Sequence, residues 1–355
     1  MGQEIPLGLS YDDVLLIPQH SKVGSRSEIN LSTQITPRVK LRLPLISINM
    51  TDVTGSDMAI ALGKLGGIGF LHRFVSPEEQ ANMVSKVKKE KVLVGAAIGI
   101  RNDYLNRAEK LVKAGTDILT IDIAHGAMQK AIEITKELKR KYYKVDIISG
   151  VVATYEGAKD LFKAGADSVR VGVGPGTICT TRITTGVGVP QITAVMDATK
   201  AAREYKRTVL CDGGTKNSGD IVKGLAAGAS AVVIGSQFAG TDEAPGKLIK
   251  KDGKKFKTYN ASTSLEEKKN HVKKLKNTGK NYLKHIEGVK ATVPYKGPVS
   301  RVVVTMEANI KSGFSYCGAR NINELWKKAQ FIRITQLGVR ESGAHDVIVE
   351  TSSLL

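Results

Sequence analysis

Short apolar runs alternate along the chain with longer amphipathic stretches in which apolar residues recur at helical spacing. Such runs are typical of parallel strands buried on both faces, with helices between them. Eight runs can be counted, at residues 44–50, 67–71, 92–99, 117–123, 145–151, 167–173, 207–212 and 230–236. The amphipathic segments 76–90 and 106–115 predict helices, with Ser76 and Asn106 as their possible N-caps.

A weak internal repeat supports the same unit. The segments 113–122, 163–172 and 226–235 each place a glycine after a predicted helix and then begin a strand rich in apolar residues. Glycine ends a helix cheaply because it tolerates positive φ. Eight strand–helix units predict an α/β TIM (βα)8 barrel, and barrel enzymes place their chemistry on the loops that follow the strands.

Three segments depart from the regular pattern. Residues 1–43 precede the first predicted barrel strand. Residues 174–192 are rich in Gly and Thr, and we expect a long catalytic loop without helix after the sixth strand. Residues 240–297 form a lysine-rich insertion after the eighth strand, which predicts a flap or lid without regular structure. We expect both loops on the catalytic face of one domain that spans residues 1–355.

The composition of the chain limits its expected cellular location and its expected partners. The sequence has no apolar run of the length that spans a bilayer and no recognisable signal peptide, so we expect a cytoplasmic protein without a membrane partner. The three cysteines are far apart and not in metal-ligand spacing, which favours a reducing compartment. The formal net charge of +19 comes largely from scattered lysines without a nucleic-acid-binding motif, so no nucleic-acid partner is expected.

Cys179 is the candidate nucleophile. It lies in the sequence GPGTICTT, where threonine hydroxyls and glycine-rich backbone surround the sulfur. A thiol reacts as its thiolate, and an exposed loop rich in amide donors favours that form. Cys211 and Cys317 have no such context, and we interpret both as buried apolar residues.

The loop VGVGPGTICTTRITTGVGVPQITAV resembles the active-site loop of the family that contains inosine-monophosphate (IMP) dehydrogenase and guanosine-monophosphate (GMP) reductase. Further similar motifs cover nearly the whole chain: SYDDVLLIP at 10–18, GGIGFLHRF at 66–74, TIDIAHG at 120–126, CDGG at 211–214, GSQFAGTDEAPG at 235–246 and EGVKATVPYKGP at 287–298. The resemblance implies a TIM barrel, a purine-nucleotide substrate, a nicotinamide cofactor and assembly as a homotetramer.

Carried over residue by residue, the resemblance makes Cys179 the nucleophile and Thr181 with Glu287 the pair that moves a proton. Asp212 would bind the ribose hydroxyls, Met50 would pack on the purine, and Asp122 would face the nicotinamide riboside. Strand-end capping is the structural alternative for the two aspartates. The implied substrate-binding residues are Met50, Thr177, Asp212, Gly213, Gly214, Gly235, Ser236 and Tyr259, of which Gly214, Gly235, Ser236 and Tyr259 would hold the 5′-phosphate. The implied cofactor-binding residues are Asp122, His125, Gly172 and Gly174, and backbone carbonyls of Gly174, Gly176 and Cys179 are a possible K⁺ site.

Within the family, the sequence favours NADPH-dependent GMP reductase. Dehydrogenases of the family typically activate water with an Arg-Tyr pair on the flap, and this chain has no arginine between Arg207 and Arg301. The sequence also runs on after the second strand, where most dehydrogenases insert a CBS regulatory domain. The motif ESGAHD at 341–346 instead resembles a monovalent-cation element of the dehydrogenases. IMP dehydrogenase with NAD therefore stays open, with Lys280 or Lys284 as substitutes for the arginine.

Several positions depart from both branches of the family. The usual MDT after the first strand is Met50-Thr51-Asp52, the usual GNV after the fifth has Val151, and the usual GMGS or GMSS segment is the sequence NASTS at 260–264. The usual DGGIR is DGGTK, which ends in Lys216. These differences leave a third hypothesis, a diverged purine-nucleotide-binding protein with little activity.

Overall fold

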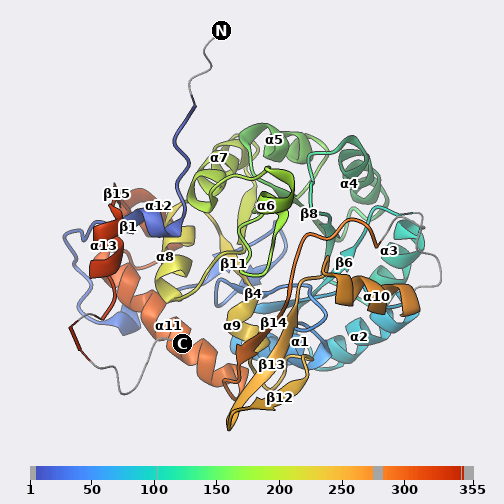
Figure 1. Ribbon diagram of the computed structural model, residues 1–355. Coiled ribbons are helices and arrows are strands. Elements are labelled where there is room, and N and C mark those ends of the chain that lie inside the picture. Colours follow the sequence, from blue (N-terminus) through green and yellow to red (C-terminus); the bar gives the residue numbers. More distant parts are fainter. Residues whose placement is uncertain (1–4, 102, 275–282, 345, 348–355) are drawn as a thin grey trace.

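Eight parallel strands close into a barrel surrounded by helices (Figure 1). The computed structural model describes residues 5–101, 103–274, 283–344 and 346–347. In order around the barrel, the strands are β4 (Leu45–Ser47), β5 (Ile68–Leu71), β6 (Val94–Ile98), β7 (Ile118–Asp122), β8 (Asp146–Val152), β9 (Ser168–Val171), β10 (Thr208–Asp212) and β11 (Ala231–Ile234). Pairing of β11 with β4 completes the closure. The predicted TIM barrel and its eight strands are confirmed.

Helices follow the strands and cover the outside of the barrel (Figure 1). They are α1 (Ser56–Leu65), α2 (Pro77–Lys89), α3 (Tyr104–Lys113), α4 (Gln129–Lys141), α5 (Tyr155–Lys163), α7 (Gln191–Glu204), α8 (Ser218–Ala226) and α11 (Val299–Tyr316), with the short α9 (Ser236–Ala239) after β11. The glycines of the repeat take the expected left-handed conformation, with φ of 91° at Gly115, 99° at Gly165 and 115° at Gly228.

One of the two predicted N-caps is confirmed. The Ser76 hydroxyl accepts a hydrogen bond from the backbone N–H of Glu79 at 3.1 Å. The prediction for Asn106 is wrong, because α3 begins at Tyr104 with Asp103 as its N-cap. The Asp103 carboxylate pairs with Arg107 at 3.0 Å, a contact with the i,i+4 spacing that is favourable along a helix.

The barrel interior is filled by apolar side chains and closed at its amino end by the N-terminal segment. Strands β2 (Thr33–Gln34) and β3 (Lys40–Leu41) form a small hairpin. Its residues Ile35, Val39 and Leu41 join one buried cluster with barrel side chains such as Phe70. Asp146, the first residue of β8, fixes this hairpin by accepting hydrogen bonds from Thr36 at 2.6 Å and from the backbone of Arg38 at 3.0 Å.

A segment near the start of the chain pairs with one near its end beside the barrel. After the short helix η1 (Tyr11–Asp13), strand β1 (Val14–Leu16) pairs antiparallel with β15 (Phe331–Arg333). The remaining elements of this region are η2 (Arg26–Glu28), α12 (Ile322–Lys328) and α13 (Gln336–Glu341). None of the helices in the described ranges combines the length and the apolar character that crossing a membrane requires.

The loop after the sixth strand contains helix, contrary to the prediction for 174–192. Residues Thr181–Thr185 form α6, and α7 already begins at Gln191. The hydroxyls of Thr184 and Thr185 donate to the backbone carbonyls of Thr180 and Thr181, four residues earlier, at 2.9 and 2.7 Å. These bonds give both hydroxyls a partner inside the short helix, and Gly186 ends the helix at φ 73°.

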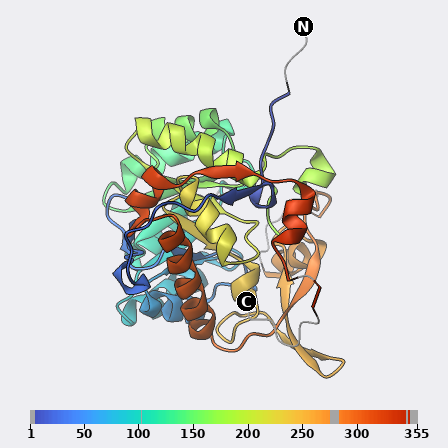
Figure 2. The ribbon, with the colours of Figure 1, turned by 90° about the vertical axis from the view of Figure 1, so that its left-hand side faces the viewer.

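The predicted flap at 240–297 has regular structure, so the expectation of a structureless lid is wrong. Strands β12 (Leu248–Lys251), β13 (Lys254–Asn260) and β14 (Lys290–Pro294) form an antiparallel sheet, and α10 (Leu265–Lys274) follows β13. The β12–β13 hairpin projects from the barrel (Figure 2). Its two-residue turn has positive φ at Asp252 and Gly253, a dipeptide that favours such turns. Because lysines surround this Asp-Gly dipeptide, the composition of the segment did not predict a hairpin.

Candidate active site

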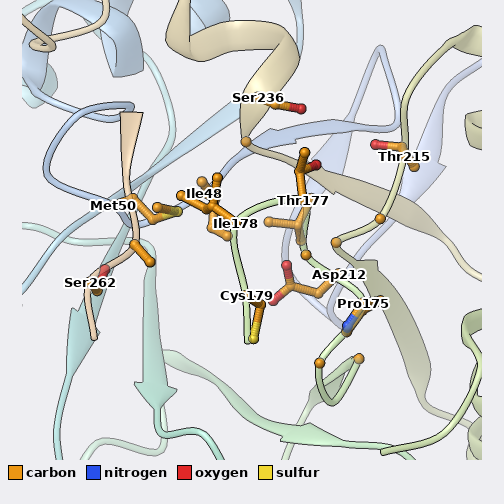
Figure 3. A pocket seen from close by; sticks show the side chains of 18 of the residues that line it. Ile48, Met50, Pro175, Thr177, Ile178, Cys179, Asp212, Thr215, Ser236 and Ser262 are labelled. Carbon is orange, nitrogen blue, oxygen red and sulfur yellow. The ribbon is translucent and has the colours of Figure 1, made fainter. Parts of the chain in front are cut away.

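A pocket opens at the carboxyl end of the barrel between the loop after β9 and the insertion (Figure 3). Figure 3 places Cys179 beside Asp212, while Ser236 and Thr215 lie on another side of the pocket and Met50 and Ser262 on a third. The lining residues are Ile48, Met50, Gly172, Gly174, Pro175, Gly176, Thr177, Ile178, Cys179, Asp212, Gly213, Gly214, Thr215, Val233, Gly235, Ser236, Tyr259, Ala261, Ser262, Thr263 and Glu287. The pocket thus combines a thiol, carboxylates, hydroxyls and a glycine-rich backbone.

A hydrogen-bonded relay connects the Cys179 thiol to a carboxylate. The Thr181 hydroxyl donates to Glu287 Oε2 at 2.7 Å, and its oxygen lies 3.1 Å from the Cys179 sulfur. Because Thr181 has a single hydroxyl proton and gives it to Glu287, its oxygen can accept the thiol proton. A proton can therefore leave the sulfur towards the carboxylate, and the half-buried Cys179 still faces the pocket.

Backbone pairing brings the two ends of this relay together. Cys179 and Gly288 form an isolated antiparallel bridge, and the Val289 N–H donates to the Ile178 carbonyl at 3.2 Å. Arg182 closes the cysteine loop by donating to the carbonyls of Val173 at 3.1 Å and Val189 at 2.6 Å. The insertion therefore supplies Glu287 to a loop whose shape is fixed by its own hydrogen bonds.

Small residues and buried hydroxyls form the side of the pocket near Ser236. Gly235 lies so close to Tyr259 that a Cβ at this position would be 2.5 Å from the phenol oxygen. Burial raises the pKa of Tyr259 well above its ordinary value, so the phenol stays protonated and can donate a hydrogen bond. Backbone amides and a phenol at strand ends are suitable donors for an anion.

Buried charges connect the pocket to the next barrel loops. The guanidinium of Arg170 in β9 contacts Asp212 at 2.6 Å and Asp122 at 3.4 Å, and it donates to Asn49 at 2.8 Å. Arg73 contacts the other oxygen of Asp122 at 3.1 Å. Burial opposes ionisation of Asp122, but the two arginines lower its pKa; burial raises the pKa of Asp212, which Arg170 offsets only in part.

Arg170 and Arg73 are the site residues that the sequence interpretation missed. A charged residue inside the buried run 167–173 was a usable signal for Arg170, because a fully buried charge needs a partner. Arg73 follows β5 without a comparable signal, since exposed arginines after strands are common. Both aspartates bind arginine side chains, a contact that the strand-end capping alternative did not include.

Most of the predicted site residues lie in this pocket, and three do not line it. Thr181 lies behind Cys179 in the relay, and Asp122 reaches the pocket only through Arg170 and Asp212. His125 is exposed and is not among the lining residues. The possible K⁺ ligands Gly174, Gly176 and Cys179 share one loop at the rim.

Two further predictions concern the lysines that could substitute for the missing arginine and the cysteines that were interpreted as buried apolar residues. Lys284 is exposed, and Lys280 lies outside the described residues, as does His345 of the ESGAHD motif. Cys211 and Cys317 are buried, which confirms their interpretation as structural residues. The Cys211 sulfur lies 2.9 Å from the Tyr11 hydroxyl.

Comparison with known proteins gives consistent relatives over the full length of the chain. IMP dehydrogenase of Borreliella burgdorferi is 39% identical, with 96% of this chain and 97% of that protein covered. IMP dehydrogenase of Nitrosopumilus maritimus is 34% identical, covering 98% and 100%, and GMP reductase of Leishmania donovani is 32% identical, covering 97% and 98%. Both enzyme names therefore occur among relatives of similar identity.

A solved structure and a family model support the same assignment. The crystal structure of a cysteine-to-alanine variant of Trypanosoma brucei GMP reductase, in complex with guanosine 5′-monophosphate, superposes with a TM-score of 0.92 at 32% identity, covering 97% of this chain and 99% of that one. The model described as IMP dehydrogenase / GMP reductase domain matches residues 8–345. The chain therefore belongs to the IMP dehydrogenase / GMP reductase family of purine-nucleotide oxidoreductases.

Proposed function

We propose that the protein is a GMP reductase that converts GMP to IMP and ammonia with NADPH as the hydride source. The observation that carries the assignment of an enzyme acting on a purine nucleotide is the relay from Cys179 through Thr181 to Glu287 in a pocket suited to a nucleotide. In the pocket, the 5′-phosphate would be held near Ser236, Gly235, Gly214 and Tyr259. The base would then lie next to Cys179, with Met50 against its face.

The reaction would begin when the thiol proton passes through Thr181 to Glu287 and the thiolate adds to C2 of the purine. Glu287 and Thr181 then return a proton to the departing amine, which leaves as ammonia. One hydride and one further proton balance the conversion of GMP to IMP, and the C–S bond breaks to release the thiolate. The nicotinamide cofactor would supply the hydride when bound.

The residues near Cys179 fit the implied cofactor and cation only in part. Gly172 and Gly174 leave the pocket wall without side chains, whereas Asp122 and His125 both lie outside the lining and the Asp122 carboxylate is already paired with Arg73 and Arg170. For K⁺, the Gly176 carbonyl already accepts the Cys179 N–H at 3.0 Å, and its second lone pair remains for a cation. We infer that Gly172 and Gly174 are the better-supported cofactor contacts, while the roles of Asp122 and His125 rest on the family resemblance.

The choice of reductase rests on the insertion. It contains no arginine, so the usual partner of a water-activating pair is missing, and the reductase reaction needs no activated water. IMP dehydrogenase is the second candidate. The ESGAHD motif and the relatives with that name favour it, with the exposed Lys284 as a possible substitute for the arginine.

The proposal also covers the domain organisation, the cellular location and the subunit number of the protein. Only α2 separates β5 from β6, where the CBS regulatory domain of most dehydrogenases would begin, which supports a single catalytic domain. Cytoplasmic location, a homotetramer and the lack of a nucleic-acid partner remain proposals. Light scattering on the purified protein would test the subunit number.

The test incubates the protein with GMP plus NADPH, and separately with IMP plus NAD, while the absorbance of reduced cofactor is followed. Loss of absorbance in the first mixture supports the reductase, gain in the second supports the dehydrogenase, and no change in either supports the nucleotide-binding hypothesis. Cys179→Ala should abolish turnover but retain GMP binding by calorimetry, whereas Cys317→Ala, a matched change at a buried thiol, should retain turnover. Full turnover by Cys179→Ala would refute the mechanism.

A further inference from the structure

Two segments that depart from the family pattern contact each other across the mouth of the barrel. Thr51 and Asp52 follow β4, and residues 260–264 are the last residue of β13 and the connection from it to α10 of the insertion. The Asn260 N–H donates to Asp52 Oδ2 at 2.9 Å. The Thr51 hydroxyl donates to Glu267 Oε2, in the first turn of α10, also at 2.9 Å. The insertion is thus attached to the barrel through the residues that differ from the family.

A second contact secures the same helix. The ring of His271 in α10 stacks on Phe74 after β5, with the centroids 3.9 Å apart and the planes at 2°. His271 also lies 3.6 Å from Glu267, the acceptor of the Thr51 hydroxyl, and both α10 side chains are almost fully buried. The docked face of α10 therefore contacts two successive barrel loops, and these contacts place the helix rather than leave it on the surface.

The attached segment holds the backbone of Glu287. The Thr263 hydroxyl donates to the Glu287 carbonyl at 2.9 Å, and the Glu287 N–H donates back to the Thr263 carbonyl at 3.4 Å. The Ala261 N–H donates to the Val289 carbonyl at 3.1 Å. Asn260, whose N–H donates to Asp52, is therefore next in sequence to Ala261, where the backbone bonds that fix Glu287 begin. A shift of residue 260 would therefore move the Glu287 carboxylate.

The attachment brings together the carboxyl groups of Asp52 and Glu267. Two like charges that are close together and partly buried lower the stability of the fold. Burial raises the pKa of Asp52, and the charge of Glu267 raises it further. Burial opposes the ionisation of Glu267, but its hydrogen bonds from His271 and Thr51 lower its pKa. The Asn260 N–H and the Thr51 hydroxyl are the donors that make this arrangement tolerable.

We propose that Thr51 and Asp52 are positioning residues that hold the insertion so that Glu287 stays within hydrogen-bond distance of Thr181. They do not line the pocket and act only through Glu287. The expected effect of these residues on turnover rests on the proposed function. Their expected effect on the position of the insertion rests only on the contacts described above.

The test compares Asp52→Ala and Thr51→Val with two controls. Asp52→Asn keeps an oxygen that can accept the Asn260 N–H. Asp117→Ala removes a carboxylate that accepts the Val94 N–H at 2.9 Å at the opposite end of the barrel, so it reports the stability effect alone. We expect Asp52→Ala to lower kcat about ten- to hundredfold, as displaced catalytic groups do, with KM for GMP changed by about twofold or less. Both controls should stay near the wild-type kcat.

A double-variant cycle separates positioning from general damage. In a Glu287→Gln background, adding Asp52→Ala should lower kcat by no more than about twofold, because the residue through which Asp52 acts is already inactive. A full additional loss in that background would overturn the proposal, as would a normal kcat in Asp52→Ala.

Amide hydrogen exchange at residues 283–290 provides a readout that does not need turnover. Asp52→Ala and Thr51→Val should exchange there about tenfold faster than wild type, equivalent to about 1.4 kcal/mol of lost attachment, whereas Asp52→Asn and Asp117→Ala should not. Unchanged exchange refutes the attachment itself. If the wild-type protein turns over neither nucleotide, the proposed function fails, and exchange still decides whether these residues hold the insertion.

Discussion

Replacement of Arg170 by Met should reveal how strongly the buried charges beneath the pocket depend on one guanidinium. The Arg170 side chain is 4% exposed and lies between Asp212, which is 6% exposed, and Asp122. Methionine fills a similar volume but leaves both carboxylates without this cation. Arg73 still neutralises Asp122, whereas among the described residues only Arg170 forms an ion pair with Asp212.

The expected loss follows from the burial of Asp212. Removing one member of a buried ion pair typically costs about 3–5 kcal/mol because the other charge stays desolvated. An unfolding entropy of about 2.1 cal/mol/K per residue gives about 0.75 kcal/mol/K for 355 residues, so Tm should fall by about 4–7 °C.

The assay is thermal unfolding of wild type, Arg170→Met and the double variant Arg170→Met/Asp212→Asn. The double variant should recover much of the lost stability, because a neutral amide is less costly to bury than a carboxylate. A Tm for Arg170→Met within about 1 °C of wild type, about the effect of 1 kcal/mol here, would refute the reasoning.

The same variant should respond to pH with a definite sign. Burial raises the pKa of Asp212, and without Arg170 nothing offsets this rise. The folded variant then binds a proton that the unfolded chain releases, so its stability relative to wild type rises as pH falls through the folded pKa. The difference in Tm between wild type and Arg170→Met should therefore be smaller at low pH than at high pH. A difference that grows as pH falls would contradict the assigned cause.

Three further outcomes test the pocket. Thr181→Val should lower kcat about a hundredfold or more, the range expected for lost proton transfer, while Thr181→Ser should keep most activity; equal losses in both would exclude a role for the hydroxyl. Gly235→Ala should weaken GMP binding in calorimetry because its Cβ would meet the Tyr259 oxygen at 2.5 Å, and the penalty should shrink in a Tyr259→Phe background. Burial raises the pKa of Cys211 to about 11, so alkylation near neutral pH should modify Cys179 before Cys211. Bound GMP should protect Cys179 from this modification. Mass spectrometry of the labelled peptides gives the order, and faster labelling of Cys211 would contradict the prediction.

The sequence alone was sufficient to predict the barrel and a pocket on the loops that follow its strands. Apolar runs bounded by glycine predict buried parallel strands from local composition, and the helix-ending glycines at 115, 165 and 228 take the conformation that the repeat predicted. The threonine- and glycine-rich context of Cys179 made it the candidate nucleophile, and the family resemblance, confirmed by comparison, implied the same role. These features were accessible because each depends on neighbours in the sequence.

Contacts between distant segments could not be predicted in the same way. The loop that contains the helix at 181–185 pairs with the insertion through Cys179 and Gly288, and the insertion folds as a sheet and helix despite its lysines. Only the tertiary structure placed Arg170 between two aspartates, and only it brought Asp52 to Asn260, 208 residues away. Barrel closure creates these neighbours: strands that are adjacent around the ring carry residues far apart in the chain, and buried charges are stable there only beside their partners.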